Sequence, residues 1–398
     1  MNIPVTHEFD IVIAGGGAAG LAAAVQAGLL AKSAGAASAL RIAVIEKKEV
    51  PGKKLSATGN GRCNLSNIAC TERETVDSFF DCLGLLTRTD EAGRMYPYSE
   101  EAGEVSALLT ETARNLNAEI MTGCQLMRAV PGAEGGFLLE INGQDGTFGI
   151  RCSKLLMAMG GKSYSAFGTT GDGYGISRRL GHTVTRLAPS LVPVQVKEEL
   201  AALSGSRIKA KASLIHSGKV TAEEEGEVQF NKDCISGICI MNLSRLLVLN
   251  PEKNFEEAFA EYEISLDLVP ELEEKVLAEC LSRRPAENRL QGLVKKKMAS
   301  WLLAQTEEPS ELARRLKDLR FTVSGTKGWN DAQVTRGGVV LEEVNMETME
   351  SEILPGLYFA GEVLDYDGPC GGWNLHFAWL TGLRAGRAMA ESVMSMKE

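Results

Sequence analysis

The chain has 398 residues, a formal net charge of −10 and a hydrophobic fraction of 44%. This length allows two or three domains with buried cores. The sequence pI of about 5.2 argues against a protein that binds nucleic acid through a basic surface. No apolar run reaches the ~18 residues of a membrane span, and residues 1–10 lack the pattern of a secretory signal. We therefore expect a cytoplasmic protein with neither a membrane nor a nucleic-acid partner.

The nine cysteines are odd in number and scattered along the chain. No CxxC pair occurs, the nearest approach being Cys234 and Cys239, and there are only four histidines. This pattern is typical of reduced thiols and argues against both a structural zinc site and a disulfide-exchange enzyme. We expect no metal.

The first 46 residues combine a strand, a glycine turn, a helix and a second strand that ends on an acid. The apolar run Phe9 to Ala14 is followed by GGGAAG at 15–20, then by helix-forming residues 21–31, and Leu40 to Ile45 ends at Glu46. This order is typical of a dinucleotide-binding unit, whose glycines allow a tight turn, approach of a pyrophosphate and close helix packing. Phosphates would meet the helix N-terminus, and Glu46 would accept hydrogen bonds from ribose hydroxyls.

The rest of the first half also alternates strand and helix signals, as a parallel α/β sheet does. Residues 151–159 predict another strand, which runs into Gly160-Gly161. No second strand–GxGxxG–helix unit is found. A nicotinamide donor would therefore have to visit transiently rather than occupy a domain of its own.

The sequence pattern changes near Pro189 and Pro193. Short runs of alternating apolar and polar residues then predict an antiparallel β region over 191–254. Residues 255–319 predict helices at 256–262, 271–282, 291–303 and 310–319 from apolar residues at helical spacing. The triple lysine 295–297 predicts a solvated helix face rather than a binding patch.

After an extended stretch over 321–344, a strand–glycine–helix pattern returns. Residues 356–362 predict a strand that ends at Gly361-Glu362, and residues 375–394 predict a helix after Gly371-Gly372. A nucleotide domain split by an insertion needs such a closing segment. We therefore predict a discontinuous domain of residues 1–190 and 336–398, an inserted β-rich domain of 191–254 and 320–335, and a helical subdomain of 255–319.

Five blocks carry a family resemblance: 15–20, 51–67 (PGKKLSATGNGRCNLSN), 160–173 (GGKSYSAFGTTGDG), 325–339 (GTKGWNDAQVTRGGV) and 356–386. They resemble the BaiN/YhiN-like bacterial flavoproteins, whose members include proteins named aminoacetone oxidases and 3-dehydro-bile-acid reductases. The resemblance implies an α/β fold with a split Rossmann-like FAD-binding domain of the two-dinucleotide-binding-domain flavoprotein type, and FAD held non-covalently. The family more usually has Tyr and Gln where this chain has Trp373 and His376, so substrate identity does not carry over.

Glycine turns, strand ends and helix starts supply the predicted FAD contacts. The loop 59–61 lets backbone approach a ligand, Arg62 suits phosphate or carboxylate, and the helix after Gly372 would face the flavin pyrimidine edge. The predicted cofactor-binding residues are Gly15, Gly17, Ala18, Ala19, Gly20, Glu46, Lys47, Lys54, Gly59, Asn60, Gly61, Arg62, Cys63, Asn64, Ala158, Gly160, Gly161, Gly361, Glu362, Asp365, Gly372, Trp373 and Asn374.

No catalytic acid or base is obvious, and a flavin carries hydride chemistry itself. The candidates are Lys162, Tyr164, Asp367, Cys370, Trp373 and His376. We expect His376 to be a packed or capping residue rather than a proton donor, and Cys63 to be structural.

The resemblance favours hydride transfer through flavin N5, from NAD(P)H as a transient donor to a C=C bond in an enone of a hydrophobic small molecule, steroid-like or bile-acid-like. Alternatives are an amine oxidase that uses O2, an RNA-binding or RNA-modifying flavoprotein, and a redox-sensing protein without turnover. The sequence leaves the substrate, the electron acceptor, the choice of NADH or NADPH and the oligomeric state open.

Overall fold

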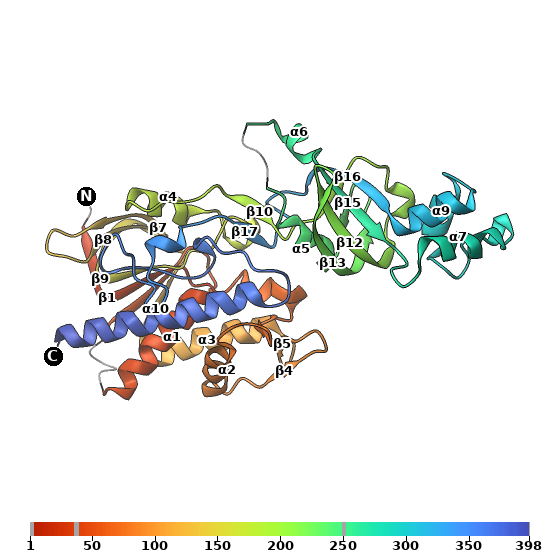
Figure 1. The fold of residues 1–398 in the computed structure, drawn as a ribbon. Helices are drawn as coiled ribbons and strands as arrows, with labels where there is room; N and C mark the ends of the chain where they lie inside the picture. Colours follow the sequence, from red (N-terminus) through yellow and green to blue (C-terminus); the bar gives the residue numbers. More distant parts are fainter. Residues whose placement is uncertain (1–3, 36–39, 249–251, 398) are drawn as a thin grey trace. The chain divides into compact units, whose positions relative to one another are not determined.

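The computed structural model describes residues 4–35, 40–248 and 252–397. The chain forms two compact units: unit 1 comprises Met1–Ala188 and Val334–Glu398, and unit 2 comprises Pro189–Gln333. Figure 1 follows the chain as it leaves unit 1, builds unit 2 and returns. The domain limits expected near residues 190 and 336 lie close to these two crossing points.

Unit 1 is built on a seven-stranded sheet with the order β6-β2-β1-β9-β8-β7, in which β18 also pairs with β9. β1, β2, β6, β9 and β18 run parallel. The predicted parallel sheet is thus only partly right, because the hairpin β7–β8 joins antiparallel to β9. The strands are β1 (Val5–Ala14), β2 (Ile42–Glu46), β6 (Ala118–Thr122), β7 (Gln125–Pro131), β8 (Phe137–Gly143), β9 (Gly146–Met157) and β18 (Leu357–Phe359).

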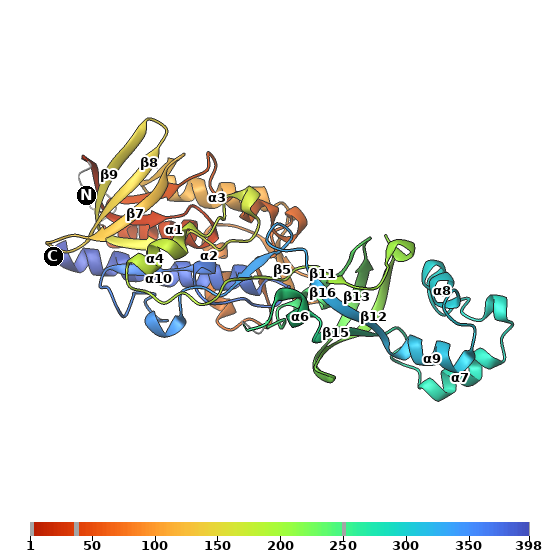
Figure 2. The same cartoon turned by 90° about the horizontal axis from the view of Figure 1, so that it is seen from above.

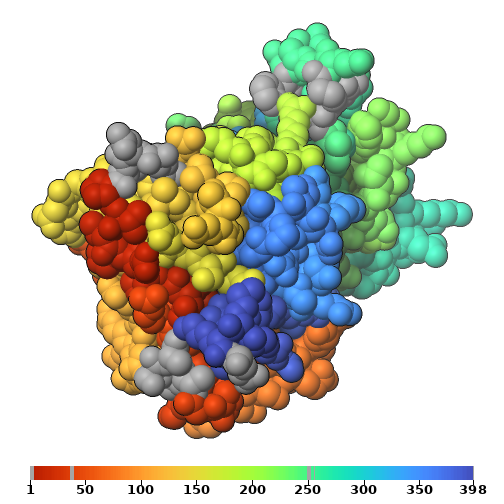
Figure 3. Space-filling view, turned by 90° about the vertical axis from the view of Figure 1, so that its left-hand side faces the viewer, coloured from red at the N-terminus to blue at the C-terminus, as the bar shows by residue number. Residues whose placement is uncertain are grey.

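Three helices pack together beside this sheet: α1 (Ala18–Ser33), α3 (Ala102–Asn115) and α10 (Trp373–Lys397). Figure 2 shows the same three helices from above. α1 and α10 approach closely because Gly382 and Gly386 face the backbone of Ala19 and Ala23, where an added Cβ would overlap a carbonyl oxygen. The final residues of α10 return to β1, where the Lys397 ammonium lies 2.8 Å from the Asp10 carboxylate. Figure 3 shows early and late parts of the chain on one face of the molecule.

Smaller elements complete unit 1. A three-stranded sheet has the order β3-β5-β4, and the short strands β10 and β17, which pair with each other, lie where the chain crosses from one unit to the other. The elements are β3 (Ser66–Asn67), β4 (Thr87–Thr89), β5 (Arg94–Pro97), β10 (Ala188–Ser190), β17 (Val334–Arg336), α2 (Arg73–Cys82), α4 (Asp172–Arg179), η1 (Leu55–Gly61), η2 (Ser165–Phe167), η5 (Leu341–Glu343) and η6 (Gly361–Val363).

Unit 2 is a closed barrel with the order β11-β14-β13-β12-β15-β16, accompanied by short helices. Its pairings are antiparallel, as the alternating runs predicted. The elements are β11 (Val194–Val196), β12 (Arg207–His216), β13 (Lys219–Phe230), β14 (Cys234–Ser236), β15 (Tyr262–Asp267), β16 (Leu319–Thr326), α5 (Ile238–Ser244), α6 (Phe255–Phe259), α7 (Glu274–Ser282), α8 (Lys296–Leu303), α9 (Pro309–Lys317), η3 (Ala201–Leu203) and η4 (Ala286–Asn288).

The helical prediction for 255–319 is wrong at β15. Every second side chain of this stretch points inward: Tyr262, Ile264 and Leu266 are 3%, 0% and 0% exposed. A repeat of two residues is the period of a strand. This strand closes the barrel between β12 and β16. α8 also begins at Lys296 rather than Gln291, because Gly292 takes a φ of +76° and ends the preceding turn.

Within the described residues, none of the helices combines the length and the apolar content of a membrane-spanning segment. Over the same residues, no group of three or more His, Cys, Asp or Glu side chains is placed to hold a metal ion. The nine cysteines are free thiols, and Cys63, Cys70, Cys152, Cys234 and Cys239 are buried.

Candidate functional site

The glycine turn between β1 and α1 is as tight as its sequence predicts. Gly15 has a φ of +109°, and its amide donates to the Ile45 carbonyl at 2.8 Å. A Cβ on Gly20 would overlap the Gly15 carbonyl oxygen, so only glycine lets the helix lie this close to the turn. The amide of Ala158, the first residue after β9, donates to the Ala14 carbonyl at 2.8 Å, and Ala158 borders the same turn.

The N-terminus of α1 is open and positively polarised. Gly17 is the N-cap and supplies no side-chain cap, and the first turn holds no acidic residue. A Cβ built on Gly17 would meet no atom within 4 Å. The amides of Ala18 and Ala19 belong to the first turn, whose N–H groups lack partners within the helix. This surface fits the pyrophosphate of a dinucleotide by charge and by space.

Glu46 lies where the second strand ends and is already tied to the backbone. Its carboxylate oxygens accept from the Gly16 amide at 2.9 Å and the Lys48 amide at 2.8 Å. These bonds fix the carboxylate at the rim of the glycine turn. Each carboxylate oxygen has further acceptor capacity for a ribose hydroxyl.

Lys47, predicted as a cofactor contact, points to α4 instead. Its ammonium lies 2.7 Å from Asp172 and 2.6 Å from the Thr170 hydroxyl, and Gln125 donates to the same Asp172 oxygen at 3.1 Å. Burial opposes ionisation of Asp172, but hydrogen bonds from Lys47 and Thr170 and the Lys47 charge outweigh it, so the pKa of this carboxyl is lowered. Lys47 therefore braces α4 in this structure.

The block around 59–64 is a kinked loop. Gly59, Asn60 and Gly61 have φ of +59°, +56° and +83°, which breaks the short helix η1 into a turn. The Arg62 guanidinium lies 4.8 Å from the centre of the Tyr96 ring, so it is held against this ring. The amides of Arg62 and Cys63 donate to the carbonyls of Gly59 and Thr58, which closes the turn. Left-handed residues next to right-handed ones are the geometry from which anion-binding backbone sites are built.

The two residues that follow Arg62 serve the protein itself. Cys63 is fully buried, and this burial raises the pKa of its thiol to about 12. Its full burial suits a structural role, and its contact with FAD stays a prediction. The Asn64 amide, oriented to satisfy both neighbours, donates to the Ser66 carbonyl and accepts from the Gly372 amide, each at 3.0 Å. Asn64 therefore ties the loop to the start of α10.

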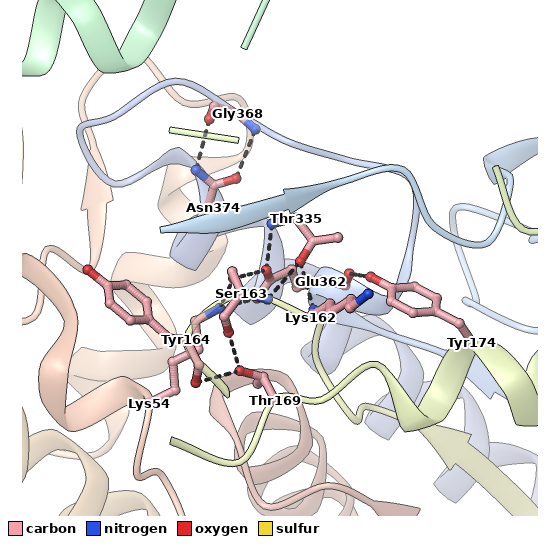
Figure 4. A network of polar contacts seen from close by, with 10 residues as sticks. All are labelled: Lys54, Lys162, Ser163, Tyr164, Thr169, Tyr174, Thr335, Glu362, Gly368 and Asn374. Carbon is pink, nitrogen blue, oxygen red and sulfur yellow. Dashed lines mark hydrogen bonds and ion pairs between the residues drawn. The ribbon is translucent and has the colours of Figure 1, made fainter. Parts of the chain in front are cut away.

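Glu362 is the centre of a polar network that joins four segments of unit 1 (Figure 4). One carboxylate oxygen lies 2.6 Å from the Lys54 ammonium. The other accepts from the Ser163 hydroxyl at 3.0 Å and the Thr335 amide at 2.8 Å. Lys54 also donates to the Ser163 hydroxyl at 2.9 Å. Lys54 and Glu362, both predicted as cofactor contacts, thus bind each other through their charged ends, and their contact with FAD stays a prediction.

The same network orders the loop after β9. The Thr335 hydroxyl accepts from the amides of Lys162 at 2.7 Å and Ser163 at 3.2 Å. Gly161 makes this approach possible, since a Cβ there would lie 2.6 Å from a Glu362 carboxylate oxygen. Thr169 donates to the carbonyls of Ser163 and Tyr164. The loop is thus fixed by hydrogen bonds at both ends.

Three residues of this network, Ser163, Thr335 and Tyr174, were not singled out from the sequence. Ser163 and Thr335 are fully buried and Tyr174 is 1% exposed. The Tyr174 hydroxyl donates to the Glu362 carbonyl at 3.1 Å, and burial, with the Glu362 charge, raises the pKa of this phenol well above its ordinary value. Their separation from Glu362 in sequence left no local signal that could have found them.

Glycines and acids near β18 frame the same edge of the sheet. Gly361 has a φ of +73° and packs against Ala19 of α1, and Gly160 has a φ of +69°. Asp365 accepts from the Thr185 hydroxyl at 2.8 Å. The backbone of this edge is therefore positioned beside the glycine turn.

The start of α10 is locked by an amide. Asn374 accepts from the Gly368 amide at 2.8 Å and donates to the Gly368 carbonyl at 2.9 Å (Figure 4). Trp373, the first residue of the helix, is half-buried, and Gly368 packs against its Cβ. The loop 368–372 therefore holds the helix N-terminus in a fixed place.

His376 is packed between the start of α10 and the segment at 66–71. It is 5% exposed, its Nδ1 lies 2.8 Å from the Ser66 hydroxyl, and its Nε2 lies 2.8 Å from the Thr71 carbonyl. A carbonyl only accepts, so Nε2 carries the proton and Nδ1 accepts from Ser66. Burial lowers the pKa of His376. Both ring nitrogens thus bond to groups of the protein, as a packed residue would, and the choice between a packed residue and a proton donor stays a prediction.

The other catalytic candidates lie in the two loops already described. Lys162 is exposed and Tyr164 is half-buried in the loop after β9, and Tyr164 takes a left-handed φ of +56°. Asp367 and Cys370 are half-buried in the loop before α10. A non-glycine residue in the left-handed region signals a conformation that its surroundings impose, here through the Thr169 hydrogen bond.

Comparison with known proteins decides the family. The model of the HI0933-like protein Rossmann domain matches residues 70–388. The chain belongs to this family. It is 35% identical to the 3-dehydro-bile acid delta(4,6)-reductase of Clostridium scindens, over 96% of this chain and 99% of that protein. It is 28% identical to proteins named ribosomal RNA dihydrouridine synthase from Escherichia coli (94% of this chain, 96% of that protein) and Haemophilus influenzae (92% and 95%).

Among solved structures, 3-ketosteroid-delta4-(5alpha)-dehydrogenase from Rhodococcus jostii has a TM-score of 0.51 and 13% identity, over 98% of this chain and 99% of that one. Quinol fumarate reductase FrdA of E. coli has a TM-score of 0.52 and 15% identity, over 98% and 71%. The resemblance to the BaiN/YhiN-like flavoproteins and the predicted fold, an α/β Rossmann-like FAD-binding domain with an insertion, are confirmed. Family and fold agree on an oxidoreductase of the flavoprotein class. The expected absence of a nucleic-acid partner is unsupported, given the names of two relatives.

Proposed function

We propose that this protein is an FAD-dependent reductase that uses NAD(P)H to reduce the C=C bond of an enone in a hydrophobic, steroid-like or bile-acid-like molecule. The observation that carries the proposal is the α1 N-terminus, open at Gly17 and free of capping or acidic side chains. The 35% identity to a bile-acid reductase over nearly the whole chain supports the choice of substrate class.

The residues of unit 1 divide the binding of FAD among them. The amides around Gly17 suit the pyrophosphate, the fixed Glu46 carboxylate suits the adenosine ribose, and the kinked loop 59–61 offers backbone amides. The amides at the start of α10 suit the flavin pyrimidine ring, where reduction places negative charge. Bound FAD would supply a hydride carrier at its N5 atom.

The overall reaction moves one hydride and one proton. NAD(P)H gives up a hydride and becomes NAD(P)+, and the C=C bond gains that hydride and a proton to become a saturated carbon pair. The protein's own part is to hold the reactants in place and to exclude water. Lys162, Tyr164, Asp367 and Cys370 remain candidates for delivering the proton, since they lie exposed or half-buried in the loops after β9 and before α10.

An anaerobic titration of the purified protein with NADH and NADPH, followed by flavin absorbance, tests this proposal. We expect bleaching by one of the two, and reoxidation by a steroid enone. Bleaching by an amine and not by NAD(P)H would make the protein an amine oxidase and overturn the proposal. A colourless protein that takes up no added FAD would overturn the cofactor assignment as well.

A second candidate substrate is uridine in RNA, which the names of two full-length relatives favour. Dihydrouridine is uridine whose C5=C6 bond, conjugated to a carbonyl, has been reduced. The chemistry thus matches that of an enone, and the same titration separates the two when RNA and a steroid enone are offered in turn as acceptors.

A further inference from the structure

One stretch of unit 2 concentrates positive charge in an acidic chain. Residues 283–297, which we term the basic segment, run from the end of α7 to the start of α8. The segment holds six cationic residues and one acid, Glu287, whereas the whole chain has a net charge of −10. The six are Arg283, Arg284, Arg289, Lys295, Lys296 and Lys297.

These cations are exposed and unneutralised. Five are exposed and Arg289 is half-buried. Among the described residues none of the six makes an ion pair, although acidic residues stand on α7 and before α9. Nearby cations behave differently: Arg314 and Arg315 both lie 2.7 Å from Glu311, and Lys317 lies 2.6 Å from Asp267. The contrast shows that the fold pairs neighbouring cations with acids but leaves the positive charge of the basic segment unneutralised, and therefore available to an anionic partner.

The segment is also well fixed. Leu290 is fully buried at its centre. Arg284 donates to the carbonyls of Arg289 at 3.2 Å and Gln291 at 3.0 Å, and Arg289 donates to the Leu281 carbonyl at 3.2 Å. Carbonyls are neutral, so these bonds hold the guanidinium groups in place and leave their charge intact.

Three of the cations stand where they do not help the helix. Lys295 is the N-cap of α8, makes no side-chain cap, and is followed by Lys296 and Lys297, with no acid in the first turn. The N-terminus of a helix is its positive end, where cations are unfavourable and anions are stabilising. The Lys297 ammonium donates to the Ser204 carbonyl at 2.7 Å, which gives it a structural role. Helix stability does not explain Lys295 and Lys296, whereas an anionic partner would.

The chemistry of the segment selects among anionic partners. Leu293 and Val294 are half-buried, so the segment exposes no large apolar side chain of the kind that inserts into a lipid surface. Several cations on a fixed surface suit a partner that repeats its phosphates. We propose that the basic segment binds the phosphate backbone of RNA. The choice of RNA rests on the second candidate substrate above, and the surface lies outside the FAD-binding residues of unit 1.

The experiment measures binding without turnover. A fluorescein-labelled RNA hairpin of about 20 nucleotides is titrated with the oxidised, FAD-loaded protein, and anisotropy is followed from 50 to 300 mM salt. Each phosphate contact contributes about 0.7–0.9 to the slope of log K against log salt. We expect the double variant Lys295→Gln/Lys296→Gln to lose about 1.4–1.8 of that slope and roughly 25- to 60-fold in affinity at 0.1 M salt.

The matched control is Lys209→Gln/Lys219→Gln, which removes two exposed lysines from β12 and β13 of the same unit. We expect this control to bind RNA like the parent. Equal losses in both variants, no RNA binding by the parent, or binding to anionic phospholipid vesicles but not to RNA would each overturn the proposal. Reduction of a steroid enone is measured separately, so its failure and the failure of RNA binding are distinguishable.

Discussion

The two units use their polar side chains in opposite ways. In unit 1 the charged ends of Lys54 and Glu362 form an ion pair with each other, and Glu362 also accepts hydrogen bonds from neighbouring loops. In unit 2 a cluster of buried apolar side chains fills the barrel, and the cations of the basic segment make no ion pair among the described residues. The contrast fits our proposals that unit 1 would bind FAD mainly with positioned backbone and that unit 2 offers side-chain charge to an anionic partner.

The core of unit 2 gives the largest expected effect. Phe321 is fully buried, with the Phe230 ring 5.9 Å away, so Phe321→Ala should lower the free energy of unfolding by about 3–5 kcal/mol. Denaturant unfolding measures the loss, and FAD affinity should stay unchanged. The control Val220→Ala, at a 57% exposed position on the same barrel, should cost under ~0.5 kcal/mol. If Phe321→Ala also weakened FAD binding, the expectation that the core of unit 2 is independent of the FAD site in unit 1 would be wrong.

The central ion pair of unit 1 comes next. Glu362→Gln leaves the Lys54 ammonium, 21% exposed, without its anion. We expect a loss of about 2–4 kcal/mol in stability together with weaker FAD binding, because the loop after β9 loses its anchor. The control pair Glu8 and Arg151 is 53% and 65% exposed, so Glu8→Gln should cost under ~1 kcal/mol and leave FAD binding intact. Equal effects at both sites would show that the network positions nothing.

The contact between α1 and α10 tests the role of closely packed backbone in unit 1, because no charged side chain is involved. Gly382→Ala forces a methyl group against the Ala19 carbonyl oxygen, and we expect a loss of about 1–3 kcal/mol. The control Gly103→Ala lies in α3, where an added Cβ meets nothing within 4 Å, so it should be neutral or stabilising by up to ~1 kcal/mol. Thermal unfolding of the two variants gives the comparison, and a stable Gly382→Ala protein would contradict it.

The smallest effect is a pH dependence of unit 1. Burial lowers the pKa values of His182 and His376, so as the pH falls the folded state takes up these protons later than the unfolded state, which binds them near the ordinary pKa of about 6.5. More protons in the unfolded state means that stability falls as pH falls through that value. We expect His376→Gln to reduce this fall between pH 7.5 and 5.5. An unchanged pH profile would show that His376 is not responsible.

The sequence predicted what depends on local backbone geometry. The turn at 15–20, the kink at 59–61 and the strand end at Glu46 follow from residue types at fixed spacing, whereas the strand predicted to reach Gly361-Glu362 ends at Phe359. It could not predict which distant side chains meet: Lys54 and Glu362 are far apart in the chain, and β15 pairs with β12 and β16 only because the barrel closes. The sequence pattern predicts Lys47 as a ligand contact because its protein partner, Asp172, lies in a distant segment that the local pattern does not connect with it.

The most direct test is equilibrium binding of FAD to the apoprotein of Gly17→Ala beside the parent, followed by quenching of flavin fluorescence. Gly17 has open space where its Cβ would stand, and its φ of −86° is accessible to alanine, so the variant should fold with unchanged stability. The account predicts at least about tenfold weaker FAD binding, as loss of one charge-assisted contact of ~1.4 kcal/mol or more implies. Unchanged affinity in the folded variant would contradict the claim that the α1 N-terminus holds the cofactor.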